Sequence, residues 1–255
     1  MKYAKALERI QSDTFSRQDV LNSFLMVYPN YKIKSFDWHF SKLLSANMLE
    51  KVGKNLYVKS NPLKTKETYT YITQSEGFLG VESLLSVEYP LAEFIIWETI
   101  ALNEFVNHQI AMNTILVMTE KMVMDSFFEL LKNHFPSVLI SPTPDEITRY
   151  GQNGSIVINT LSSRYPKNPK QRHRYSIEKF IVDLFAEKTI TSIISKGDYP
   201  GALEIIFERY KINETKLFNY ARTRYVDEQI LVMIKENTNI KLYTGAEVSP
   251  NAESQ

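Results

Sequence analysis

The chain has 255 residues, of which 44% are hydrophobic and 23% charged, a composition that is typical of a globular protein and excludes a wholly disordered one. The sequence has no cysteine, which excludes a disulfide framework and a thiolate metal site. No stretch approaches the roughly 20 apolar residues of a membrane span, and the first residues, MKYAKALERIQ, lack the apolar run of a signal peptide. We therefore expect a cytoplasmic protein.

The formal net charge of +1 hides an uneven distribution of charge along the chain. Residues 1–66 hold 12 Lys and Arg against 5 acidic residues, a net charge of +7, which leaves 18 against 24, or −6, for the remainder. A basic head on an acidic body is typical of a nucleic-acid-binding module joined to a second domain. The polar stretch SNPLKTKE, residues 60–67, predicts a boundary. We expect domains at 1–62 and 68–240, followed by a disordered tail at 241–255.

Taken in chain order, the first elements predict a winged helix-turn-helix. Apolar residues at helical spacing indicate a helix over Tyr3–Ile10, and Ser16 is placed to cap a second helix that ends before Pro29. A third helix follows, for which Ser35 is the expected N-cap. The segment GKNLYVK, residues 53–59, then predicts a β-ribbon with its turn at Gly53-Lys54.

The third helix has the two faces that a recognition helix needs. Phe36, Phe40 and Leu43 share one face at helical spacing, while the other face carries Trp38 and hydrogen-bonding side chains. Lysines before the helix and beside the wing are suited to phosphate contacts. The predicted DNA-binding residues are Arg17, Lys32, Lys34, Ser35, Trp38, Ser41, Lys42, Ser45, Lys54 and Lys59. A small helical domain with a solvated lysine face, and a Trp38 buried between domains, are the alternatives.

The remaining sequence predicts an α/β layer that ends in helices. Alternating or continuous apolar residues indicate strands, and the strand–helix–strand order favours parallel pairing. The expected strands are Tyr69–Thr73, Glu93–Glu98, Thr114–Met118, Ser137–Ser141 and Ser155–Leu161, and the expected helices are Ala101–Gln109, Met122–His134, a Ser176-capped helix, Tyr199–Tyr210, Glu214–Arg222 and Asp227–Lys235.

A basic loop, YPKNPKQRHR at residues 165–174, interrupts this acidic body. Its candidate contact residues are Arg164, Lys167, Lys170, Arg172 and Arg174. Such a loop is suited to an acidic protein partner, RNA or the second half of a DNA site. A merely solvated loop is the alternative.

Little in the sequence favours catalysis. Glu98, Glu120 and Lys121 at the ends of apolar strands suggest a nuclease-like metal site, but adjacent residues on a strand point to opposite faces. Gly154-Ser155 lacks the carboxylates that follow the glycine-serine of nucleotidyltransferases, and the four histidines lack metal-ligand spacing. The charged residues Glu178, Lys179 and Asp183 fit a solvated helix face. We therefore expect a protein that is not an enzyme and needs no cofactor.

The chain resembles the antitoxin and transcriptional-repressor component of AbiE-type abortive-infection toxin–antitoxin systems of bacterial phage defence. The resemblance is carried by FSRQDVL and GKNLYVK, then by EFIIWET and ILVMTE, and finally by SIEKFIVDLF and LFNYARTRYVDEQI. It implies an N-terminal domain that binds operator DNA and represses its own operon. It also implies a C-terminal antitoxin domain whose counterpart is a nucleotidyltransferase toxin encoded beside it.

Together these inferences predict an α+β protein: an N-terminal winged helix-turn-helix followed by a mixed α/β domain ending in a helical bundle. The expected function is that of a DNA-binding autorepressor and antitoxin, with operator DNA and the cognate toxin as partners. A stand-alone winged-helix transcription factor is the main alternative, and a metal-dependent restriction-type nuclease is the other.

Overall fold

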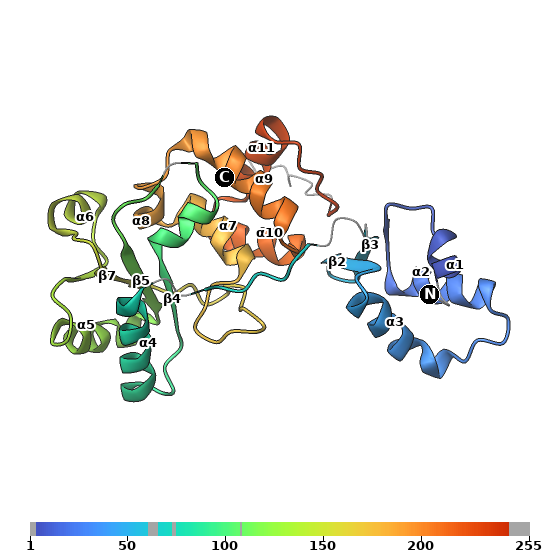
Figure 1. The fold of residues 1–255 in the computed structure, drawn as a ribbon, viewed down its shortest axis with the longest axis horizontal. Helices are drawn as coiled ribbons and strands as arrows, with labels where there is room; N and C mark the ends of the chain where they lie inside the picture. Colours follow the sequence, from blue (N-terminus) through green and yellow to red (C-terminus); the bar gives the residue numbers. More distant parts are fainter. Residues whose placement is uncertain (1–3, 61–65, 73–74, 108, 245–255) are drawn as a thin grey trace, which may run out of the picture.

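The computed structural model describes residues 4–60, 66–72, 75–107 and 109–244 of the protein (Figure 1). Its first body spans residues 4–60 and combines three α-helices with a small antiparallel sheet in the order β1-β3-β2. The elements are α1 (Ala4–Glu8), β1 (Thr14–Phe15), α2 (Arg17–Val27), a 3₁₀ turn (Ile33–Ser35), α3 (Phe36–Ser45), β2 (Leu49–Gly53) and β3 (Leu56–Lys59).

Local sequence accounts for these elements. Ser16 and Asp19 form a reciprocal capping box at the start of α2, which satisfies backbone N–H groups that the first turn leaves free. Asn55 lies in the β2–β3 turn at φ 53°, a left-handed conformation that asparagine tolerates. Apolar residues from α1, α2, α3 and the sheet then close a core of their own around Phe24 and Phe40.

The second body is a mixed four-stranded sheet with helices on both sides. The strand order is β4-β5-β7-β6; β4 pairs antiparallel to β5, whereas β5, β7 and β6 are parallel. Its elements are α4 (Glu76–Glu88), β4 (Phe94–Glu98), a 3₁₀ helix (Thr99–Glu104), β5 (Thr114–Thr119), a 3₁₀ turn (Lys121–Val123), α5 (Met124–Lys132), β6 (Val138–Ile140), α6 (Pro144–Tyr150), β7 (Ser155–Thr160), α7 (Ile177–Ala186), α8 (Lys188–Thr191), a 3₁₀ turn (Lys196–Asp198), α9 (Tyr199–Arg209), α10 (Glu214–Thr223) and α11 (Asp227–Asn237).

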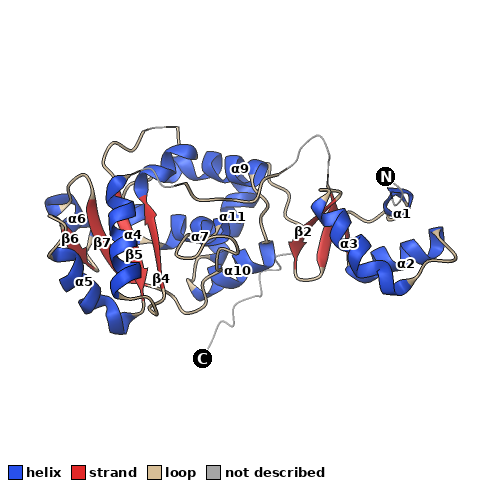
Figure 2. Ribbon diagram, turned by 60° about the horizontal axis from the view of Figure 1, so that its bottom comes forward, coloured by secondary structure: helices blue, strands red, loops and turns tan. Residues whose placement is uncertain are grey.

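The helices α7, α9, α10 and α11 gather on the side of the sheet that faces the first body (Figure 2). Buried residues of the sheet and of these helices form one continuous core, separate from the core of residues 4–60. The protein is therefore a mixed α and β protein with two small sheets, as the sequence predicts at this coarse level.

The two bodies are in contact. The Lys54 amide donates to the Thr215 hydroxyl at 3.1 Å, and Lys211 Nζ donates to Asn47 at 2.7 Å. A Cβ on Gly53 would lie 2.8 Å from the Thr215 hydroxyl oxygen, so only glycine allows this approach. The tip of the β2–β3 hairpin thus contacts the first turn of α10.

Several predicted elements are corrected. Tyr69 and Tyr71 are buried in an extended segment that joins no named strand, and Thr73 lies outside the described residues. The predicted helix over Ala101–Gln109 is a shorter 3₁₀ helix that ends at Glu104, and the helices α4 and α6 were not predicted.

The tail also begins later than predicted. Residues 241–244 are described, and the Tyr243 and Thr244 amides donate to the buried carboxylate of Glu214. The other residues of the predicted disordered tail, 245–255, lie outside the described residues.

Candidate nucleic-acid interface

Helix α3 separates a buried face from an exposed one. Phe36, Phe40 and Leu43 are at most 5% exposed and pack into the core of the first body. Trp38 is 62% exposed, which contradicts burial between domains, and Lys42 Nζ lies 5.4 Å from the centre of its ring. Ser41 and Ser45 are also exposed, although the Ser45 hydroxyl donates to the Lys42 carbonyl. The exposed face therefore offers a flat aromatic, a cation and a hydroxyl.

Ser35 does not cap α3 as predicted. It closes the 3₁₀ turn before the helix at φ −90° and ψ −2°, and its hydroxyl accepts no bond from the first turn. The 3₁₀ turn instead satisfies amides at this end with backbone carbonyls, since the Ser35 amide donates to the Lys32 carbonyl and the Phe36 amide donates to the Ile33 carbonyl. Lys32, which precedes this turn, and Lys34, which lies within it, are both exposed.

Two of the predicted phosphate contacts, Arg17 and Lys59, are engaged within the protein. Arg17 forms an ion pair with Asp37 while its guanidinium lies over the Phe36 ring. Lys59 donates to the Ile10 carbonyl. Lys54 stands at the docked hairpin tip, although its side chain is exposed. The structure thus brings together Trp38, Ser41, Lys42 and Ser45 on one surface and gives Arg17 and Lys59 structural partners.

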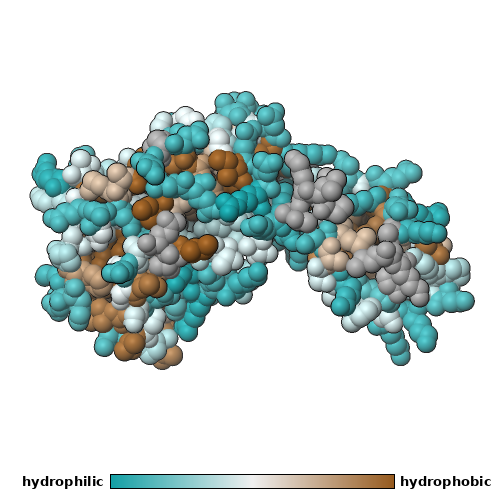
Figure 3. Space-filling view, in the orientation of Figure 1, coloured by the Kyte–Doolittle hydropathy of each residue, from teal (hydrophilic) through white to brown (hydrophobic). Residues whose placement is uncertain are grey.

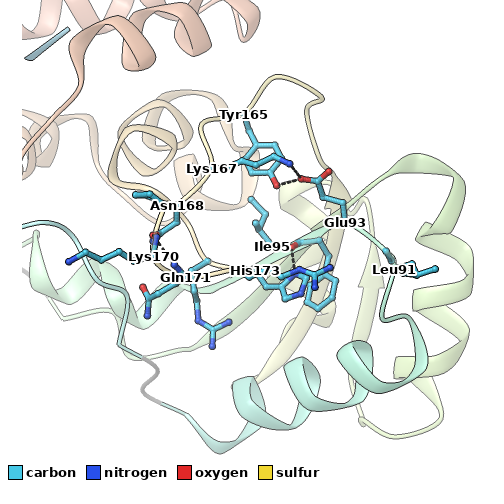
Figure 4. Close-up of a pocket in the computed structure, with 14 residues that line it drawn as sticks. Leu91, Glu93, Ile95, Tyr165, Lys167, Asn168, Lys170, Gln171 and His173 are labelled. Carbon is cyan, nitrogen blue, oxygen red and sulfur yellow. Dashed lines mark hydrogen bonds and ion pairs between the residues drawn. The ribbon is translucent and has the colours of Figure 1, made fainter. Parts of the chain in front are cut away.

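The basic loop is held in a fixed shape by its own side chains. Asn168 accepts bonds from the amides of Lys170 and Gln171 and donates to the Tyr175 carbonyl. The Gln171 side chain pairs with both backbone groups of Tyr71. The loop and the start of β4 enclose a cavity of about 440 Å³ (Figure 4).

The five candidate cations of the loop have different environments. Lys167 forms an ion pair with Glu93 at 2.5 Å, and Arg174 forms a bidentate ion pair with Glu82 on α4. Arg172 donates to the Pro90 carbonyl at 3.3 Å. Lys170 is exposed, and Arg164 lines a separate groove with Lys216 and Arg222 of α10. The loop is therefore partly neutralised rather than uniformly basic.

A buried charged network was missed by the sequence analysis. Lys179 and Asp183 of α7 are fully buried and lie 2.5 Å apart, which contradicts the solvated face predicted for them and for Glu178. Arg224 reaches the same carboxylate at 3.2 Å. Burial lowers the pKa of Lys179 and raises the pKa of Glu187, which accepts a bond from Asn159 on β7.

The only signals for this network in the sequence are the i, i+4 spacing of Lys179 and Asp183 and the apolar residues around them. Both signals are also found on solvated helices, so they do not identify a buried pair.

The nuclease-like site is not assembled. Glu98 pairs in register with Ile115 near the start of β5, whereas Glu120 follows the end of that strand. The two carboxylates therefore lie at opposite ends of the sheet, and Glu98 is fully buried against Ser75 and Asn113. Within the described residues, no three acidic or histidine side chains group as metal ligands.

Comparison with known proteins gives a family but no activity. The model of a family of unknown function (DUF6577) matches residues 35–240, and the chain belongs to this family. Among solved structures, the chain is similar to the crystal structure of the RV2827C protein from Mycobacterium tuberculosis, with 10% identity, a TM-score of 0.25, and coverage of 94% of this chain and 82% of that one. That TM-score carries no argument. No curated protein matches the chain, and none of its described helices has the length and apolarity needed to cross a membrane.

Proposed function

We propose that this member of a family of unknown function is a DNA-binding regulator whose first body is a winged helix-turn-helix. Helix α3 is the recognition helix and the β2–β3 hairpin is the wing. The exposed face of α3 carries the proposal, because Trp38, Ser41, Lys42 and Ser45 point away from the core that holds Phe36 and Phe40. The net charge of +7 over residues 1–66 supports the same reading.

The shape of the molecule supports a mode of docking. The two bodies form an arch with a hollow between them (Figure 3). Helix α3 lies at the lower side of the first body in Figure 1, and α11 lies at the top of the second. In this mode Lys32, Lys34 and Lys42 contact phosphates, while Trp38 and Ser41 contact base edges.

The hairpin has an unusual part in the proposal. A wing contacts DNA through its tip, but here the tip contacts α10. We therefore assign sequence reading to α3 and assign to the hairpin the role of fixing α3 relative to the second body. Lys54 keeps an exposed side chain and remains a proposed phosphate contact.

The resemblance to AbiE-type antitoxins adds a cellular role to the proposal. It supports autorepression of the operon and neutralisation of a nucleotidyltransferase toxin encoded beside it. A stand-alone transcription factor is the competing proposal, and the identity of the neighbouring gene separates the two.

The test is a gel-shift titration of the full chain on its own promoter region at two salt concentrations. Lys42→Ala should weaken binding to all sequences and reduce the salt slope by about 1, whereas Trp38→Ala should change the preference among sequences. Lys235→Ala on α11, also an exposed helical lysine, is the matched control and should bind as the wild type does. If Lys42→Ala and Lys235→Ala behave alike, α3 is not the recognition helix.

A further inference from the structure

The cavity beside the basic loop is preorganised. It lies between residues 91–95, which lead into β4, and residues 165–174, and its volume of about 440 Å³ falls in the range that binds small molecules. Asn168 and Gln171 fix the loop from inside. His173 is held at φ 60°, a left-handed conformation that costs a non-glycine residue energy and that clusters at binding sites.

The cations of the cavity are not balanced by acids. Glu93 is the one carboxylate in its lining, and it is already engaged by Lys167 and by the Tyr165 hydroxyl, both at 2.5 Å (Figure 4). Those bonds lower the pKa of Glu93, which keeps it ionised and the pair neutral. Among the described residues, no acidic side chain pairs with Lys170 or Arg172. The guanidinium of Arg172 is therefore available to a ligand, whereas the Lys170 side chain extends away from Glu93 and His173 (Figure 4).

His173 supplies a hydrogen-bond acceptor next to this guanidinium. Its ring stacks on Phe94 at 3.9 Å, and its Nδ1 lies 2.8 Å from the Phe94 carbonyl oxygen. Because a carbonyl only accepts, Nδ1 must carry the hydrogen. Burial lowers the pKa of the ring, so the neutral form is favoured and Nε2 is left as an acceptor.

We propose that this cavity binds a small phosphorylated molecule that also carries a hydroxyl group, such as a nucleotide or a sugar phosphate. Arg172 contacts the phosphate oxygens, since guanidinium groups suit phosphate geometry. His173 Nε2 accepts a hydrogen bond from the hydroxyl. Leu91, which is 95% exposed at the rim, forms an apolar wall for the body of the ligand. This site does not depend on DNA binding by α3.

Isothermal titration of the full chain at constant ionic strength tests the proposal, with inorganic phosphate, adenosine monophosphate and glucose 6-phosphate as probes against a chloride background. We expect saturable binding of at least one phosphorylated molecule. Whether adenosine monophosphate or glucose 6-phosphate binds more tightly distinguishes a nucleotide site from a sugar-phosphate site. Arg172→Gln should weaken that binding about tenfold or more, whereas Lys235→Gln should not change it.

A second variant separates the acceptor from the charge. His173→Phe keeps an aromatic ring against Phe94 but removes Nε2, so it should weaken the hydroxyl-bearing ligand and leave inorganic phosphate unchanged. The proposal is overturned if no probe binds more tightly than chloride. It is also overturned if Arg172→Gln binds like the wild type, or if only oligonucleotides bind while the small probes do not.

Discussion

Removing Asp183 tests the buried network most directly. Asp183→Ala leaves the Lys179 ammonium with no exposed surface and with only the Tyr220 hydroxyl and the Met118 sulfur, both at 3.3 Å, as acceptors. Breaking a buried pair in this way costs roughly 3–5 kcal/mol, because an uncompensated charge stays in the core. We therefore expect the free energy of unfolding of the second body to fall by about that amount.

The matched variants share the site but differ in the charge left behind. Lys179→Met removes the ammonium and leaves Asp183 paired with Arg224 at 3.2 Å, so its cost should be smaller, about 1–2 kcal/mol. The double variant Lys179→Met, Asp183→Leu removes both fully buried charges of these ion pairs and leaves only Arg224, which is partly exposed. It should therefore be more stable than Asp183→Ala alone.

Urea titration with tryptophan fluorescence measures these differences. Trp97 is fully buried in β4 and its emission reports on the second body, whereas Trp38 is already exposed in the native protein. A loss of less than about 1 kcal/mol for Asp183→Ala, or a double variant less stable than it, would refute the reasoning about buried charge.

Three further changes probe other features. Glu187→Gln should stabilise the protein at pH 7.5, because burial raises the pKa of this carboxyl and penalises its charged form. The gain should shrink as the pH falls and disappear below the ordinary glutamate pKa of about 4.3, where the acid is protonated in both states. A gain that grows on acidification would contradict this. Ser176→Ala removes both the cap of α7 and the bond to the Pro166 carbonyl, so urea unfolding should show a loss of about 1–2 kcal/mol, against none for the exposed Ser163→Ala. Gly53→Val should push the hairpin off Thr215 and increase the radius of gyration in solution scattering, and an unchanged scattering curve would show that the bodies are not held by this contact.

The parts of the fold that the sequence predicted are those with an unmistakable apolar pattern. The strands β5 and β7 were predicted from TILVM and SIVINTL, and the strand–helix–strand order predicted parallel pairing, which is found between β5 and β7 and between β7 and β6. That β5 pairs with β7 and not with β6 was not predicted. Helix α4 was missed because Gly77 and Gly80 lower its helix propensity and its exposed face carries Leu79 and Val87, which blurs the amphipathic pattern. Tyr69 and Tyr71 are buried, as their alternation with polar residues predicted, but the segment that carries them is not one of the strands.

The candidate site was predictable only in part. The two faces of α3 followed from helical spacing, since burial of Phe36 and Phe40 depends on local geometry. The partners of Arg17 and Lys59 depend on where Asp37 and the Ile10 carbonyl lie after folding, and no spacing rule reports this. The buried Lys179 looked solvated because charge is the usual mark of exposure.

The extended segment at residues 66–72 has a consequence for the order in which the chain acquires its structure during synthesis. The Glu67 amide donates to the Arg209 carbonyl, the Lys211 amide donates back to Glu67, and Tyr71 is paired with Gln171. An early stretch of the second body thus pairs with residues that are synthesised a hundred or more positions later, whereas residues 4–60 form a hydrophobic core among themselves. On the ribosome, the first body can fold as soon as it emerges, while the second must remain incomplete until α10 has been synthesised.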